Sequence, residues 1–297
     1  MAPLVLRLTA CLALAFALLC PAAAQELTGT LKKVRDSRLL VIGYRENAFP
    51  FSYLNARRQP VGYTIDLCLA IVDEIAAELE GREFGVNYKP VTAESRIPAL
   101  IAGDIDLECG ATTNNVERQK QVAFSPIIFV AGTKLLVKRG SRITSYRDLR
   151  DRTVVVTAGT TNEAALRKLS EKQNLGIKLV VAKDHGESYA IFASGRADAF
   201  ATDDVLLYGL IAREKAGADF HIVGEYLSYD PYGIMYRKDD PALAEVIDRT
   251  FRKLAESRDI VQIYDKWFMR PLPDGVRLGL PMSAQLEEMF RVIGLPD

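Results

Sequence analysis

The stretch AGDIDLECG (Ala102–Gly110) returns in a related form as SGRADAFATDD (Ser194–Asp204). Each begins with a small residue and a glycine, places an aspartate three positions after that glycine, continues through apolar residues and ends in polar ones. Glycine is common just after the last residue of a helix, so Gly103 and Gly195 are predicted to end helices that precede short buried strands. The repetition predicts two related lobes.

Strands and helices alternate around both stretches. Residues 39–44, 84–91 and 104–110 read as strands, with helices at 64–80 and 95–103 between them. The same alternation of strands and helices then repeats, with strands at 153–159, 177–183 and 197–204, a helix at 162–174 and a second helix ending near Gly195. Short apolar strands separated by amphipathic helices predict an α/β fold, with an open sheet flanked by helices in each lobe.

Two extended segments are predicted to cross between the lobes, at about 127–136 and 225–235. Lobe 1 then comprises 25–130 and 231–297, and lobe 2 comprises 131–230. Residues 240–268 form one long helical region that should pack on lobe 1. The proline-rich stretch from about Pro271 is predicted to be a loosely docked tail. Two lobes joined by two crossings leave a cleft between them.

The N-terminus resembles a secretory signal peptide. Arg7 precedes an apolar run from Leu8 to Cys20, and a Pro-Ala-Ala-Ala sequence follows, so cleavage is predicted after Ala24. A lipoprotein interpretation of Cys20 is disfavoured because the preceding residue is Leu19 rather than a small one. No later segment approaches the roughly 20 apolar residues of a membrane helix. The mature protein is therefore predicted to be exported to the periplasm.

Composition excludes several classes of function. The 38 basic and 38 acidic residues balance, which gives no basic excess for nucleic acid or anionic membrane. Cys68 and Cys109 remain after the predicted cleavage; they could pair in an oxidising compartment, but we interpret them as small buried apolar residues. With only His185 and His221 and no Cys/His cluster, neither a metal nor a cofactor is expected. A monomer is expected.

Polar side chains follow the predicted strands of both lobes. In open α/β sheets ligands bind beyond the carboxyl ends of the strands, so these residues should face one cleft. Arginine pairs in-plane with a carboxylate, and an aspartate suits an ammonium group. An acidic amino acid has this arrangement of charges. The residues at these positions are Arg45, Arg96, Thr113, Arg118, Thr160, Thr161, His185, Asp203 and Asp204.

Each of these residues also has a purely structural interpretation. A single arginine at a strand end is more often solvated or paired with a helix dipole. Thr160 or Thr161 would serve as a helix N-cap, and Asp203 or Asp204 would cap a helix beginning at Val205. His185 would be an ordinary loop residue. What favours a binding site is that such residues recur at the same end of both predicted sheets.

Several runs carry a resemblance to a known family: GYRENAFPFSY, ECGATTNNVERQKQVAFS, VVVTAGTTNE, AKDHGES and YRKDDP. From about Leu31 to Pro273 the chain resembles the periplasmic solute-binding proteins of polar amino acid ABC transporters, solute-binding protein family 3. Within the family it is most similar to members that bind glutamate and aspartate. The resemblance implies a type II two-lobed fold with hinge closure, and delivery of L-glutamate or L-aspartate to a membrane permease.

The resemblance also implies roles for individual residues. The ligand's α-carboxylate would be held by Arg118 with groups around Ala111, Thr113 and Thr161, and its ammonium group by Asp203. The side-chain carboxylate would be surrounded by Arg45, Arg96 and His185. The family pattern has serine at Ala93 and Ala111, and a lost neutral hydrogen bond costs about 0.5 to 1.5 kcal/mol. These changes bear on affinity or on the preference between glutamate and aspartate.

Three alternatives differ in class or ligand. An exported lyase or dehydratase on the same scaffold would use Glu108 or Asp204 as acid or base, but no nucleophile–base pair or metal cluster accompanies them. The chain is therefore predicted not to be an enzyme. A sensory ectodomain would be expected to carry a fused membrane segment. A binding protein for glutamine or asparagine would keep the transport role. The sequence gives no role to Glu108.

Overall fold

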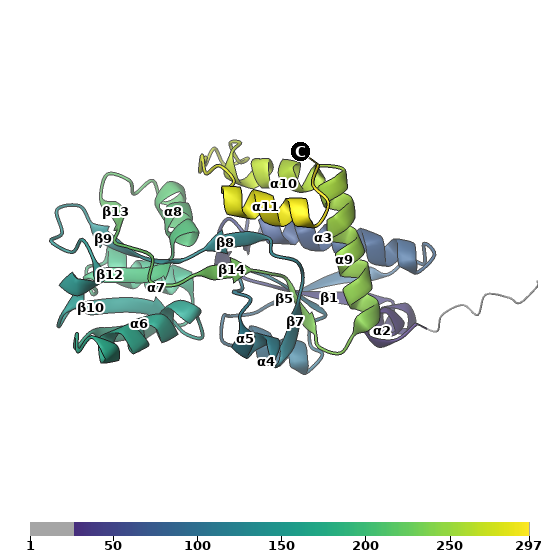
Figure 1. Ribbon diagram of the computed structural model, residues 1–297, viewed down its shortest axis with the longest axis horizontal. Helices are drawn as coiled ribbons and strands as arrows, with labels where there is room; N and C mark the ends of the chain where they lie inside the picture. Colours follow the sequence, from purple (N-terminus) through teal and green to yellow (C-terminus); the bar gives the residue numbers. More distant parts are fainter. Residues whose placement is uncertain (1–26, 297) are drawn as a thin grey trace, which may run out of the picture.

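The computed structural model describes residues 27–296, and the predicted signal peptide lies outside that range. Two five-stranded sheets form two lobes along the long axis of the molecule, each covered by helices (Figure 1). The predicted α/β two-lobed architecture is confirmed.

The sheet of lobe 1 contains segments from both halves of the chain. Its first three strands are parallel, and the last two run antiparallel to their neighbours. The strand order is β5 (Gly85–Pro90), β1 (Leu39–Tyr44), β6 (Leu107–Cys109), β15 (Met235–Arg237) and β7 (Val122–Phe124). The helices of this part of the chain are α2 (Gly29–Ser37), α3 (Tyr63–Glu78), α4 (Arg96–Ile101) and α5 (Val116–Gln119), and a small sheet contains β2 (Asn47–Ala48), β3 (Ser52–Leu54) and β4 (Pro60–Val61).

The sheet of lobe 2 repeats this arrangement. Three parallel strands are again followed by two that each run antiparallel to their neighbour. The strand order is β11 (Lys178–Ala182), β10 (Thr153–Thr157), β12 (Ala199–Asp203), β9 (Thr133–Lys138) and β13 (Phe220–Val223). The helical segments are η1 (Tyr146–Leu149), α6 (Thr161–Lys172), α7 (His185–Ala193) and α8 (Asp204–Arg213).

The repeated sequence stretch occupies equivalent places in the two sheets. Asp106, just before β6, donates its backbone N–H to the Val41 carbonyl at 2.7 Å and accepts the Val41 N–H on its carboxylate at 2.8 Å. Asp198, just before β12, makes the same pair of bonds with Thr153, both at 2.8 Å. The aspartate therefore fixes the register of β6 against β1 in lobe 1 and of β12 against β10 in lobe 2.

The glycines of the repeat end helices as predicted. Gly103 follows α4 with φ of 77°, and Gly195 follows α7 with φ of 80°. Positive φ is readily adopted by glycine, which lets the chain turn sharply from helix to strand.

The chain crosses between the lobes twice. β8 (Phe129–Ala131) and β14 (Asp230–Tyr232) pair antiparallel and run side by side between the two sheets (Figure 1). An aromatic cluster holds this pair against lobe 1: Phe129 and Tyr232 contact Phe51, and the Tyr63 hydroxyl donates to the Ile128 carbonyl at 2.9 Å. The crossings are thus anchored on lobe 1.

The C-terminal segments pack on lobe 1. The predicted helical region contains two helices, α9 (Pro241–Glu256) and α10 (Asp259–Phe268), separated at Arg258, whose φ is 64°. The prediction of a loosely docked tail is wrong. α11 (Ala284–Val292) lies against β8 (Figure 1). It buries Leu286 and Phe290 in the core of lobe 1, because these two residues form the apolar stripe of an amphipathic helix.

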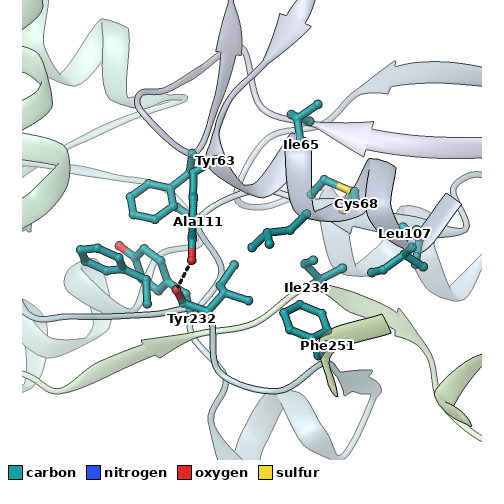
Figure 2. Close-up of a cluster of buried hydrophobic side chains, with 14 of the residues drawn as sticks. Tyr63, Ile65, Cys68, Leu107, Ala111, Tyr232, Ile234 and Phe251 are labelled. Carbon is teal, nitrogen blue, oxygen red and sulfur yellow. Dashed lines mark hydrogen bonds between the residues drawn. A yellow bond between two sulfur atoms is a disulfide. The ribbon is translucent and has the colours of Figure 1, made fainter. Parts of the chain in front are cut away.

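The two cysteines are buried, as expected, and of the two states that the sequence left open they have the paired one. Cys68 in α3 and Cys109 at the end of β6 form a disulfide within the lobe 1 core, beside Ile65 and Leu107 (Figure 2). The helix packs directly over the strand, which brings two cysteines 41 positions apart into bonding distance. The disulfide ties α3 to the strand that leads into the cleft.

Candidate functional site

Parallel strands of both lobes end at one small polar cavity. Arg45 follows β1, Arg96 begins α4 after β5, and Ala111 follows β6. From the other lobe, His185 follows β11 and Asp203 ends β12. The complete lining is Arg45, Arg96, Ala111, Thr113, Thr160, Thr161, Asn162, His185, Asp203 and Leu206. Of the ten residues considered for the site, eight therefore lie together, and Arg118 and Asp204 lie outside the lining.

Two arginines of lobe 1 are buried at this cavity. Arg45 and Arg96 are each 2 % exposed. Arg96 donates through Nη1 to the Ala111 carbonyl at 3.1 Å and to Thr112 Oγ1 at 2.5 Å. Arg45 Nη2 and Arg96 Nε are buried without a hydrogen-bond partner within residues 27–296. A buried charged donor without an acceptor is costly, so these atoms favour a ligand that brings carboxylate oxygens.

Burial and the neighbouring arginine charges lower the pKa of Arg45 and of His185. Burial lowers the pKa of Arg45 to about 10, and the adjacent charge of Arg96 adds to this effect. Burial, followed by the charges of Arg45 and Arg96, lowers the pKa of His185 well below its ordinary value. His185 is therefore a neutral imidazole at pH 7, with Nδ1 2.9 Å from Thr157 Oγ1. It can contribute a hydrogen bond to an anion without adding charge.

Lobe 2 contributes a buried carboxylate opposite the arginines. Asp203 accepts from Asn162 Nδ2 at 2.7 Å and from the Tyr232 hydroxyl. Burial, followed by the charge of Asp230, raises the pKa of Asp203 to about 7. Its side chain makes no capping bond to α8, whereas Asp204 accepts from the Val205 N–H at 2.8 Å. Asp203 therefore does not have the capping role that we considered for it.

Of the two threonines considered either as helix caps or as site residues, Thr160 is a cap and both line the cavity. Thr160 caps α6 by accepting the Glu163 N–H at 3.1 Å, so its structural role is real even though it lines the cavity. Thr161 Oγ1 instead lies 3.2 Å from Thr113 Oγ1 of lobe 1. This hydroxyl pair joins the lobes directly at the cavity wall.

Arg118 lies outside the cavity lining, although it was predicted as a site residue. Its guanidinium donates through Nη1 to the Thr113 carbonyl at 2.8 Å and through Nη2 to the Gly159 carbonyl of lobe 2 at 3.4 Å. Burial lowers the pKa of Arg118 to about 9, with the charge of Arg96 contributing. Arg118 thus bridges the lobes beside Thr113 in this closed arrangement.

Two lining residues were missed by the sequence interpretation, Asn162 and Leu206. Asn162 orients Asp203 and also donates to Thr133 Oγ1 at 2.6 Å. A polar residue in the first turn after Thr160-Thr161 was a weak signal for it. Leu206 reads as an ordinary core residue of α8, so no sequence signal separates it from its neighbours.

Across 27–296, no group of three or more His, Cys, Asp or Glu side chains is arranged to hold a metal ion. Over the same range no helix is both long and apolar enough to cross a membrane.

Paired sheets, two crossings and a buried polar cavity between the lobes define a two-lobed ligand-binding protein. The chain belongs to the bacterial extracellular solute-binding proteins, family 3, whose model matches residues 40–270. It is a solute-binding protein rather than an enzyme.

Two bacterial binding proteins are similar to this chain over most of its length. The L-glutamate/L-aspartate-binding protein of Pseudomonas aeruginosa is 44 % identical over 272 residues, which cover 91 % of this chain and 90 % of that one. The glutamate/aspartate import solute-binding protein of Escherichia coli K12 is 42 % identical over 270 residues, covering 91 % and 89 %. Among solved structures, an ancestral arginine-binding protein bound to arginine has a TM-score of 0.70 at 33 % identity, covering 77 % of this chain and 98 % of that one.

Proposed function

We propose that this protein binds L-glutamate and L-aspartate between its lobes and delivers them to the permease subunits of an ABC importer. The observation that carries the proposal is the buried pair Arg45 and Arg96, with donors Nη2 and Nε unsatisfied within the described chain, facing Asp203 across the cavity. An amino dicarboxylate supplies acceptors for these arginines and a cation for the aspartate. The names of the two relatives support the same ligand class.

Each proposed contact follows from charge and position. The side-chain carboxylate would lie against Arg45, Arg96 and the neutral His185. The α-carboxylate would be held by Arg118 with Thr113, Thr161 and the backbone around Ala111, which requires the Arg118 guanidinium to exchange a carbonyl partner for the ligand. The ammonium group would pair with Asp203 in place of the present Tyr232 and Asn162 bonds or beside them.

Closure of the lobes supplies the affinity in this proposal. When lobe 2 covers the ligand, water leaves the charge pairs and each interaction strengthens in the lower dielectric. Micromolar affinity corresponds to about 8 kcal/mol, which a few charge-assisted hydrogen bonds provide after entropy costs. We further propose that the protein acts in the periplasm, because the family is extracellular and the N-terminal run resembles a signal peptide. We propose a monomer as its working form.

Calorimetric titration of refolded, ligand-free protein tests the proposal. Glutamate, aspartate, glutamine and asparagine would each be titrated in the same buffer. Tight one-to-one binding of the two acids, with weak binding of the amides, is expected. Equal or tighter binding of an amide would overturn the acidic specificity and leave the solute-binding family unchanged. The absence of serine at Ala93 and Ala111 makes the ratio between glutamate and aspartate informative in the same experiment.

Arg96→Ala tests the proposed recognition of the second carboxylate. Because Arg96 would contact that group, the substitution should weaken glutamate and aspartate binding far more than binding of a neutral amino acid. Asparagine and glutamine are the matched controls for size. An equal loss for acids and amides would remove Arg96 from the specificity role.

A further inference from the structure

Glu108 is a carboxylate buried beside the arginines that no proposed ligand contact uses. It lies in β6 next to Cys109, is fully buried, and leaves Oε1 without a hydrogen-bond partner in the described part of the chain. Gly110 provides the room for it, because a Cβ there would overlap Glu108 Oε1 and lie 2.8 Å from Arg45 Cγ. The chain thus keeps a charged side chain in the core of the site, where an uncompensated charge is costly.

A hydroxyl group stands between Glu108 and Arg96. Glu108 Oε2 accepts from Thr112 Oγ1 at 2.6 Å, and Thr112 Oγ1 accepts from Arg96 Nη1 at 2.5 Å. No ion pair within 4.0 Å joins Glu108 to an arginine among residues 27–296. A direct pair would occupy the guanidinium fork that a ligand carboxylate needs. Thr112 therefore lets Glu108 act on the arginines without taking the place of the ligand.

The charge of Glu108 reaches all three arginines of lobe 1. It supports the charged forms of Arg45, Arg96 and Arg118 and raises the pKa of each, against the lowering caused by their burial. Asp203, by contrast, supports only Arg96 and Arg118 in this way. Glu108 is thus a shared counter-charge for the arginine cluster.

We propose that Glu108 is a specificity-determining residue that limits how strongly the cavity prefers a ligand with a second carboxylate over its amide. The inference rests on the proposed function and deepens it. A fixed negative charge keeps the three arginines together in the closed, ligand-free protein. The same charge repels an incoming dicarboxylate, which moderates its affinity and permits its release.

Glu108→Gln tests the charge with little change in shape. Removing one negative charge beside the arginines should raise the acid-over-amide ratio of affinities by about 50-fold, as expected for two charges about 7 Å apart at an effective dielectric near 20. The ratio would be measured by titrating glutamate and glutamine into wild type and variant. An unchanged or lower ratio would overturn the proposal, because a purely structural role would weaken both ligands together.

Thr112→Val provides the matched opposite test. Without the hydroxyl, Glu108 is free to pair directly with Arg96 and to block the fork, so glutamate affinity should fall. The double variant Glu108→Gln/Thr112→Val should recover affinity, since the blocking carboxylate is gone. If the loss caused by Thr112→Val is the same in both backgrounds, Thr112 does not hold Glu108 away and the proposal fails.

A ligand-free measurement separates this proposal from the proposed function. The unfolding temperature of the ligand-free protein would be measured at increasing concentrations of sodium sulfate. It should rise more for Glu108→Gln than for wild type, because sulfate can replace Glu108 as counter-charge for the arginines. An equal rise in both proteins would count against the proposal. If wild type prefers an amide, the proposed function fails. A rise in the acid-over-amide ratio in Glu108→Gln would still support the role of Glu108 in that case.

Discussion

The two lobes place opposite kinds of side chain at the ends of their parallel strands. In lobe 1, the ends of β1 and β5 lead to Arg45 and Arg96, both cationic. In lobe 2, the ends of β11 and β12 lead to neutral His185 and to Asp203. The sheet topology is the same, so topology supplies the positions and the side chains supply the chemistry. A ligand must bring both signs of charge to satisfy both lobes, which couples lobe closure to ligand identity.

The largest loss of ligand affinity is expected when an arginine of lobe 1 is replaced. Arg118→Ala removes the proposed partner of the α-carboxylate, which every amino acid carries, and also the bridge to the Gly159 carbonyl. Truncating one partner of a buried charge pair should weaken binding of all amino acids by at least about 100-fold. Calorimetry with glutamate and glutamine measures the loss. Retained glutamate binding would show that the α-carboxylate is held elsewhere.

The next effect concerns how closely lobe 2 can approach lobe 1. Gly209 lies in α8, and a Cβ there would lie 2.8 Å from the ring and the carbonyl oxygen of Phe49 in lobe 1. Gly209→Ala should favour the helix but hinder closure, and overpacking of this kind should weaken glutamate binding by about tenfold. Small-angle scattering with ligand should show a more open molecule.

Gly217→Ala is the matched control for that experiment. A Cβ at Gly217 would meet only Ile211 Cγ2 at 3.8 Å, which is an ordinary contact. Affinity should be unchanged. If Gly209→Ala behaves like this control, the contact between α8 and Phe49 does not limit closure.

A smaller effect follows from the acidic lobe and depends on pH. Asp203 must be ionised to pair with an ammonium group, and its pKa is raised to about 7 by burial and by Asp230, with Tyr232, Asn162 and Asp204 also facing it. Glutamate affinity should therefore fall as pH drops below about 7, by about fivefold between pH 7 and pH 6, with proton release on binding. Titrations in buffers with different ionisation heats count the protons. Affinity that stays constant from pH 5.5 to 8 would contradict the raised pKa.

The same pKa has the opposite consequence for the ligand-free protein. The folded state holds a proton on Asp203 up to about pH 7, whereas an unfolded aspartate loses it near pH 4. Its contribution to the free energy of unfolding should therefore decrease as pH rises from about 4 to about 7 and then level off. Thermal unfolding with and without glutamate would show the two opposite slopes.

The smallest effect on binding is expected from the disulfide of lobe 1. Replacing Cys68 and Cys109 together by alanine opens a crosslink between residues 41 positions apart, which should lower the free energy of unfolding by about 4 kcal/mol. Glutamate affinity should change less than twofold, because the arginines are held by other contacts. A large loss of affinity would mean that the tie from α3 to β6 positions Ala111 and the site.

Much of the site could be predicted because strand ends are visible in the sequence. Arg45, Arg96, His185 and Asp203 each follow an apolar run, and the open-sheet rule brings such positions together. The position of Arg118 outside the cavity lining and the lining role of Leu206 could not be predicted. Both depend on how far the lobes close, and no local pattern encodes that distance.

By itself, the sequence determined the two related lobes, because the spacing from Gly103 to Asp106 and from Gly195 to Asp198 specifies a helix end followed by a buried strand. It also determined the charges available at the strand ends. The tertiary structure alone decided that Cys68 bonds to Cys109, that α11 belongs to the lobe 1 core, and that Glu108 is linked to Arg96 through Thr112. These outcomes depend on contacts between segments far apart in the chain, where packing and desolvation rather than local propensity choose the partner.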